Sequence, residues 1–173
     1  LVADISHSAP VSLLQHVLQT LLGEKVSVRN LPRIVEAVAE AAADTKSVAM
    51  ITEHVRRRLA NQICKSLVDG AGYLPVVTLS QPWEQEFAAH TKVNGDQKAF
   101  TLDPQRTHEF ILAARQTLQP FVERDERVAM LVQPEFRDVI RQMLERVSPS
   151  TPVLSHNEIH RSVNVRTAGT VGA

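Results

Sequence analysis

The stretch LLGEKVSVRNLPRIVEAVAE, residues 21–40, decides how this chain begins to fold. Gly23 stands where a glycine commonly ends a helix, and Val26 and Val28 alternate with polar residues as in a short strand. The segment NLP at 30–32 is typical of a helix start, because Asn is a frequent N-cap and proline fits the first turn. Apolar residues at helical spacing then predict a second helix: Leu31, Ile34, Val35, Val38 and Ala42.

Two more apolar stripes flank this stretch. Upstream, Ser8 and Pro10 predict a helix start, and the stripe behind them is Val11, Leu14, Leu18, Leu21 and Leu22. Downstream, apolar residues recur every four positions and predict one continuous third helix: Ile51, Val55, Leu59, Ile63 and Leu67. Three such stripes can bury one another, so residues 1–70 are expected to form a small helical bundle subdomain.

The pattern changes after the turn sequence DGAG at 69–72, and we place the subdomain boundary there. Strand-like runs then alternate with helix starts at Pro82, Pro104 and Pro134. The expected strands are 73–79, 98–102, 128–132, 152–154 and 163–171, with a turn at 94–96. Residues 71–173 therefore predict a small α/β subdomain with a mixed sheet of three to five strands, which makes the chain α+β overall.

The composition is that of an ordinary globular chain, with 43% hydrophobic and 22% charged residues. Nineteen basic residues balance nineteen acidic ones, which removes any bulk electrostatic reason to expect nucleic acid or an anionic membrane as a partner. The apolar runs are far shorter than the roughly 18 residues that a membrane-spanning helix needs. The chain starts with Leu1 and has no signal-peptide pattern, so we expect it to be part of a longer protein.

The sequence shows no motif for catalysis, a cofactor or a metal. It contains no glycine-rich phosphate loop and no GxSxG elbow. The seven histidines are scattered, and only His156 and His160 lie four apart, without a third ligand. Cys64 is the single cysteine, which excludes an internal disulfide and is expected to be a packed thiol. We predict a protein that is not an enzyme and that needs no cofactor.

Two features have a functional interpretation beside a structural one. The triplet Arg56, Arg57 and Arg58 spreads around a helix, which favours solvated or subunit-facing arginines over a nucleic-acid patch. Trp83, the lone tryptophan, either caps the core of the second subdomain or anchors a partner, because Trp is favoured at binding hot spots.

The stretch at 21–40, together with TEHVRRRLANQI at 52–63 and PVLSHNEI at 152–159, resembles the C-terminal cytoplasmic part of the FlhA-type export gates of type III secretion systems, the FHIPEP family. The resemblance implies a non-enzymatic assembly protein on the cytoplasmic side of the bacterial inner membrane, attached through a membrane region outside this sequence. It implies other copies of the chain as partners in a subunit ring, and also export chaperones, export substrates, and the ATPase complex with its stalk. The main chaperone pocket of the family belongs to a preceding subdomain.

Ring contacts are heterologous, so each subunit must offer two different patches. The charged residues Glu24, Lys25, Arg29 and Arg33 lie outside the apolar stripes, and we predict that they form part of one patch; solvated charges are the alternative. The sequence LLGEKVSVRNL favours a flagellar gate over its virulence homologue. Two other classes stay open, namely an enzyme with a site between the subdomains and a free-standing adaptor that binds peptides in a groove. Long apolar segments upstream of Leu1 would favour the gate.

Overall fold

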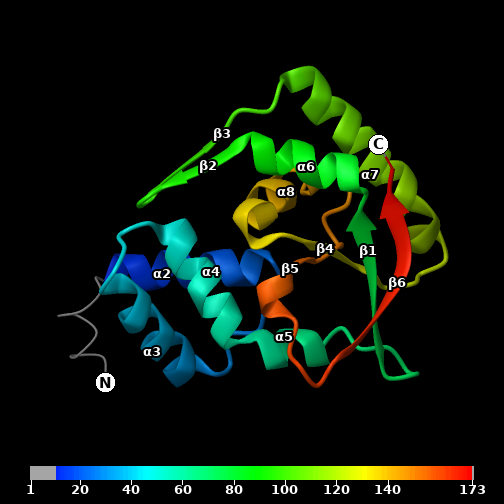
Figure 1. Cartoon of the computed structure of the whole chain (residues 1–173). Coiled ribbons are helices and arrows are strands. Elements are labelled where there is room, and N and C mark those ends of the chain that lie inside the picture. The colour runs from blue at the N-terminus through cyan, green and yellow to red at the C-terminus, as the bar shows by residue number, and fades with distance from the viewer. Residues whose placement is uncertain (1–10, 173) are drawn as a thin grey trace. The chain divides into compact units, whose positions relative to one another are not determined.

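The computed structural model describes residues 11–172, which divide into two compact units after Ile63 (Figure 1). The division comes before the boundary that we expected after Gly70. Cys64 donates a hydrogen bond to the carbonyl of Glu158, 3.1 Å away, and the Asp69 carboxylate accepts one from the Tyr73 N–H at 3.0 Å. The segment 64–70 therefore belongs with the second unit. The helix start expected at Ser8 and Pro10 lies outside the described residues.

The first unit is helical. It contains α2 (Val11–Gly23), α3 (Leu31–Ala42) and α4 (Val48–Arg58), and α5 (Ala60–Lys65) begins in it. Residues of the predicted stripes supply most of its core, with Leu21, Ile34, Val38, Ile51 and Val55 buried. The first two stripes were wrong in part: Val11, Leu22 and Leu31 are exposed, and Val17, which lies outside the predicted stripe, is buried. The expectation of one continuous third helix was wrong: α4 ends at Arg58, and the next residue, Leu59, caps it with an N–H that bonds to the carbonyls of Val55 and Arg56. The apolar residues keep their four-residue spacing across this break because α4 and α5 both bury apolar side chains.

The segment between α2 and α3 is not a strand, contrary to the alternation of Val26 and Val28. No ladder partner lies beside it among the described residues. Val26 is buried and Val28 is only half-buried, so the alternation reflects one anchoring side chain in an otherwise irregular connection.

The second unit is built on a four-stranded parallel sheet in the order β5-β4-β1-β6. The strands are β1 (Tyr73–Leu79), β4 (Ala129–Val132), β5 (Val153–Ser155) and β6 (Asn164–Val171). The helical elements are α6 (Gln81–Ala89), α7 (Pro104–Glu123), η1 (Pro134–Phe136), α8 (Arg137–Leu144) and η2 (His156–Glu158). A separate antiparallel hairpin pairs β2 (Thr91–Asn94) with β3 (Gln97–Phe100). A helical part followed by an α/β part confirms the predicted α+β class.

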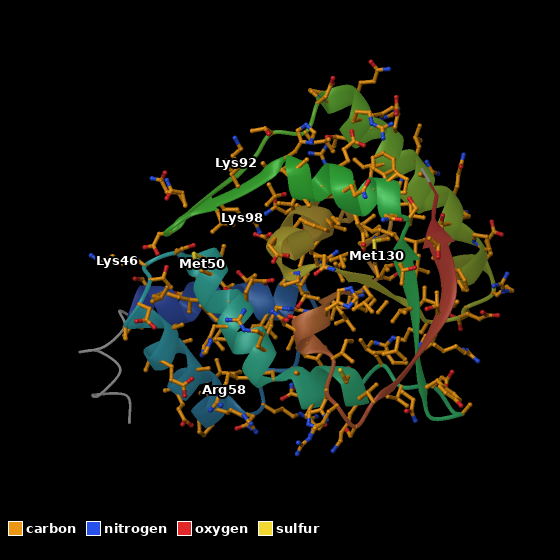
Figure 2. The ribbon with its side chains drawn as sticks, viewed as in Figure 1. Lys46, Met50, Arg58, Lys92, Lys98 and Met130 are labelled. Atoms are coloured by element: carbon orange, nitrogen blue, oxygen red, sulfur yellow. The ribbon has the colours of Figure 1, made fainter. Side chains whose placement is uncertain are left out.

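Aromatic rings fill the interior of the second unit. The ring centroid of Phe87 lies 4.7 Å from that of Phe110 and 5.4 Å from that of Phe136, and the centroids of Trp83 and Phe110 are 5.1 Å apart. The buried Met130 of β4 joins this cluster (Figure 2). The core thus joins residues from α6, α7, β4 and η1, which fixes these elements against one another.

The hairpin carries polar residues, and sequence periodicity identified only its second strand. Lys92 and Lys98 lie on it (Figure 2), and Lys98 forms an ion pair with Asp138 of α8. The turn expected at 94–96 is confirmed, with Gly95 at a φ of 62°. The expected strand 98–102 is β3, which ends at Phe100.

The PVLSHNEI motif forms β5 and a capping box. The Glu158 carboxylate accepts a hydrogen bond from the Ser155 N–H at 2.9 Å, and the Ser155 side chain bonds in return to the backbone at Glu158. Both residues are buried. The motif therefore ends a strand and satisfies buried polar groups, as its S-x-x-E pattern indicates.

Candidate functional site

The connection between α2 and α3 begins with a Schellman motif. The Val26 N–H bonds to the Leu21 carbonyl at 2.9 Å, and the Lys25 N–H bonds to the Leu22 carbonyl at 3.0 Å. Lys25 takes the left-handed position of this motif, with a φ of 61°. The helix ends at Gly23, as expected from sequence, but the left-handed residue of the motif is Lys25, two positions later.

We predict that Lys25→Gly raises the free energy of unfolding by about 0.5–1 kcal/mol, because glycine adopts a positive φ without the steric cost that Lys25 bears. Urea unfolding followed by far-UV circular dichroism measures this. Lys46→Gly, at an exposed position without a positive φ, is the control and should not stabilise the chain. A loss of stability in Lys25→Gly would contradict the account of this turn.

Other contacts hold the inner side of the connection in the helical unit. Glu24 lies 3.5 Å from Arg56 of α4, and the side chains are 12% and 2% exposed. The side chain of Gln62 donates to the carbonyl of Ser27 at 2.8 Å. These contacts from α4 and α5 give the connection a fixed conformation and direct Glu24 inward. Arg56 is thus a buried residue of its own unit, which corrects the expectation of solvated or subunit-facing arginines at that position.

The outer side of the connection is apolar and basic. Leu22 is 56% exposed and Leu31 45%. The remaining residues of this side are Lys25, Arg29 and Arg33, all exposed. We call these five residues the α2–α3 surface. It holds three of the four residues predicted to form a subunit patch, whereas Glu24 is separated from them by its inward position.

The start of helix α3 contributes Leu31 and Arg33 to the α2–α3 surface, and acidic residues follow toward the other end of the helix. Glu36 and Glu40 are exposed and four residues apart, so they lie along one side of the helix, and the exposed Asp44 follows in the turn just after the helix end. The hydrogen bond from His54, and then the charge of Arg58, hold the pKa of Glu40 below its usual range. We call these three residues the α3 acidic surface. The helix start is regular, with Pro32 in the first turn, but the Asn30 side chain makes no capping hydrogen bond.

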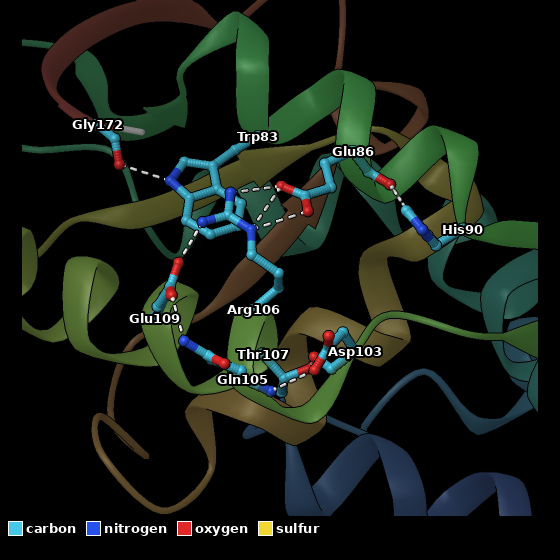
Figure 3. A network of polar contacts seen from close by, with 9 residues as sticks. All are labelled: Trp83, Glu86, His90, Asp103, Gln105, Arg106, Thr107, Glu109 and Gly172. Carbon is cyan, nitrogen blue, oxygen red and sulfur yellow. Dashed lines mark hydrogen bonds and ion pairs between the residues drawn. The ribbon is translucent and has the colours of Figure 1, made fainter.

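Trp83 lies inside the second unit, which agrees with the structural interpretation of this residue. Its side chain is 1% exposed, and its indole N–H donates to the carbonyl of Gly172 at 2.5 Å. The Arg106 guanidinium covers the ring at 4.4 Å and is held between Glu86 and Glu109 (Figure 3). The indole is therefore covered by Arg106 and its two carboxylates and is not exposed at the surface of its unit.

Lowering the pH should weaken the contact of Arg106 with the ring of Trp83. The hydrogen bond from Arg106 holds the pKa of Glu86 below its usual value. A carboxyl with a lowered folded-state pKa contributes stability above its unfolded pKa of roughly 4.3, and the contribution is lost as pH falls through the folded-state pKa. We expect a change in Trp83 emission in that acidic range, before far-UV circular dichroism changes. Glu86→Gln should lack this step; an unchanged titration profile in that variant would exclude Glu86 as its source.

The remaining candidate residues have structural surroundings. Burial raises the pKa of the Cys64 thiol, as expected for a packed cysteine. Within residues 11–172 no three His, Cys, Asp or Glu side chains are grouped so that they could hold a metal ion. None of the helices described is both long and apolar enough to cross a bilayer.

The helical unit and the parallel-sheet unit together define a class of two-unit α+β domains. A model of the FHIPEP family matches residues 1–164, and the chain belongs to that family. The chain is 40% identical over 167 residues to the flagellar biosynthesis protein FlhA of Caulobacter vibrioides, a match that covers 96% of this chain and 24% of that protein.

Two further comparisons come from secretion systems. The chain is 31% identical over 167 residues to the invasion protein InvA of Salmonella typhimurium, covering 95% of this chain and 24% of that protein. The nonameric EscV cytosolic domain from the type III secretion system superposes with a TM-score of 0.82 at 25% identity, covering 98% of this chain and 50% of that one. The chain thus spans about a quarter of the length of the relatives it matches.

Proposed function

We propose that this chain is a non-enzymatic part of a bacterial type III export gate, placed on the cytoplasmic side of the inner membrane. Its first unit joins neighbouring subunits into a ring. Its second unit helps to position export substrates, their chaperones and the ATPase complex with its stalk. Membership of the FHIPEP family supports the export-gate assignment, and the nonameric state of the EscV domain supports the ring.

A flagellar gate is favoured over a virulence gate. The identity to FlhA of Caulobacter vibrioides is 40%, and the identity to InvA of Salmonella typhimurium is 31% over the same number of residues. This difference agrees with the resemblance of residues 21–31 to flagellar gates.

The observation that carries the ring proposal is the charge asymmetry along α3. The α2–α3 surface at the start of this helix combines two exposed leucines with three cations, whereas the α3 acidic surface carries three carboxylates further along. A cyclic assembly needs two different, complementary patches on each subunit. The basic surface of one copy can meet the acidic surface of the next, and the leucines supply apolar area at the contact.

The full-length protein tests this proposal. We expect Arg29→Glu combined with Arg33→Glu to abolish the large oligomer in sedimentation velocity, because like charges then face each other. Adding Glu36→Arg and Glu40→Arg should restore it. Arg115→Glu, an exposed charge reversal on α7, is the control. Large oligomers that persist in the double variant would contradict the assignment of these surfaces.

A further inference from the structure

Strand β6 is an open edge of the parallel sheet (Figure 1). It pairs with β1 on one side, and no strand described lies against its other side. Six of its eight residues are exposed. In a parallel strand alternate residues direct their N–H and C=O groups toward opposite neighbours, so the outer side of β6 presents backbone donors and acceptors to solvent.

The sequence of β6 does little to prevent another strand from pairing. NVRTAGTV contains neither lysine nor proline, the residues that commonly protect sheet edges, and it is rich in β-branched side chains. Its register with β1 shifts after Thr167, so Ala168 is the extra residue of a bulge. The uninterrupted part of the edge is therefore the stretch 164–167.

Charge indicates the kind of segment that fits. Residues 159–172 contain Arg161 and Arg166 and no Asp or Glu. Arg166 contacts Asp69 at 3.3 Å, but this pair is exposed to solvent and contributes little stability. An acidic side chain on an added strand can therefore compete with Asp69 for Arg166. A second copy of β6 has no acidic residue to offer, so a segment of a different protein is the better occupant.

A hollow of about 380 Å³ lies on the same strand. Arg166 and Ala168 line it, and Pro75, Phe121 and Val128 give it apolar walls. Directly opposite residues on neighbouring strands have Cβ atoms about 5 Å apart, and residues two apart face the same side. An added strand with a carboxylate opposite Arg166 pairs regularly up to Thr167, and its next same-facing residue lies at the bulge, where Ala168 lines this hollow.

From these features we infer that the outer edge of β6 at 164–167 accepts an extended segment of another protein. The segment carries an acidic residue followed, two positions later, by an apolar one. Backbone hydrogen bonds hold the segment, the acid pairs with Arg166, and the apolar side chain enters the hollow. This contact belongs to the second unit and does not depend on the ring proposed above.

A fluorescein-labelled peptide, STVETLVS, tests the inference by fluorescence anisotropy on this chain. We expect saturable binding that Arg166→Glu weakens by at least about tenfold, and that the lysine peptide STVKTLVS recovers with that variant. Arg115→Glu is the matched control and should bind the glutamate peptide as the unaltered chain does. Arg166→Gln gives a second reading if the charge reversal impairs folding, and circular dichroism checks folding of each variant.

Backbone pairing is tested with two N-methylated forms of the same peptide. Each form is methylated on alternate residues, so that the N–H groups on one side of the extended peptide are blocked in one form and those on the other side in the second. One form should lose binding and the other keep it, because only one edge of the peptide donates to β6. Equal binding of both forms, binding that ignores Arg166, or no saturable binding would overturn the inference. A homodimer that needs Arg166 and resists the peptide would also overturn it, because the occupant would then be a second copy.

Discussion

Arg56→Ala is expected to lower the free energy of unfolding by about 3–5 kcal/mol, because it leaves the Glu24 carboxylate without its arginine in a poorly hydrated position. The two side chains are 2% and 12% exposed, and removing one member of a buried pair costs far more than breaking a solvated one. Urea unfolding followed by far-UV circular dichroism measures the loss in the helical unit.

Arg57→Ala is the matched control, since Arg57 is the adjacent residue, carries the same charge and is exposed. It should change stability by no more than about 0.5 kcal/mol. Arg56→Met together with Glu24→Leu removes both charges and is expected to recover most of the loss. Equal effects of Arg56→Ala and Arg57→Ala would show that the ion pair does not hold the connection.

Trp83→Ala is expected to cost about 3–5 kcal/mol, the range for deleting a buried aromatic side chain. The change removes the contact with Phe110, the cover provided by Arg106 and the hydrogen bond to Gly172. Circular dichroism is the suitable measurement because the variant has no other tryptophan.

Trp83→Phe separates packing from hydrogen bonding. It keeps an aromatic ring and should lose about 1–2 kcal/mol, mostly from the unpaired Gly172 carbonyl. Leu112→Ala on α7 is the control, because Leu112 is exposed. A Trp83→Ala variant of unchanged stability that loses a partner would favour the other interpretation of this residue, a direct anchor.

Periodicity predicted most helices and strands because it reports which face of an element is buried. The stripes around Ile34 and Phe110 therefore became α3 and α7, and the apolar run at 128–132 became β4. The break at Leu59 was not predicted, because both sides of it keep the same apolar spacing. The exposed strand β2 was not predicted either, because a polar hairpin buries no periodic face.

Charged positions were harder to predict than apolar ones. Glu24, Lys25, Arg29 and Arg33 share one connection in sequence, but only tertiary contacts separate the inward Glu24 from the outward cations. Its partner Arg56 is 32 residues away, and a triplet of arginines alone does not show which member is buried. Local sequence likewise did not distinguish Gly23 from Lys25 as the left-handed residue of the turn.

The proposed contact between copies is tested most directly by a photo-crosslinking residue at position 29 of the full-length protein in bacterial cells. We expect covalent dimers and higher multiples after irradiation. The same residue at position 112, on α7 of the second unit, should give no such ladder at equal expression. No crosslink between copies from position 29, or an equal ladder from position 112, would contradict the claim that the α2–α3 surface joins the subunits.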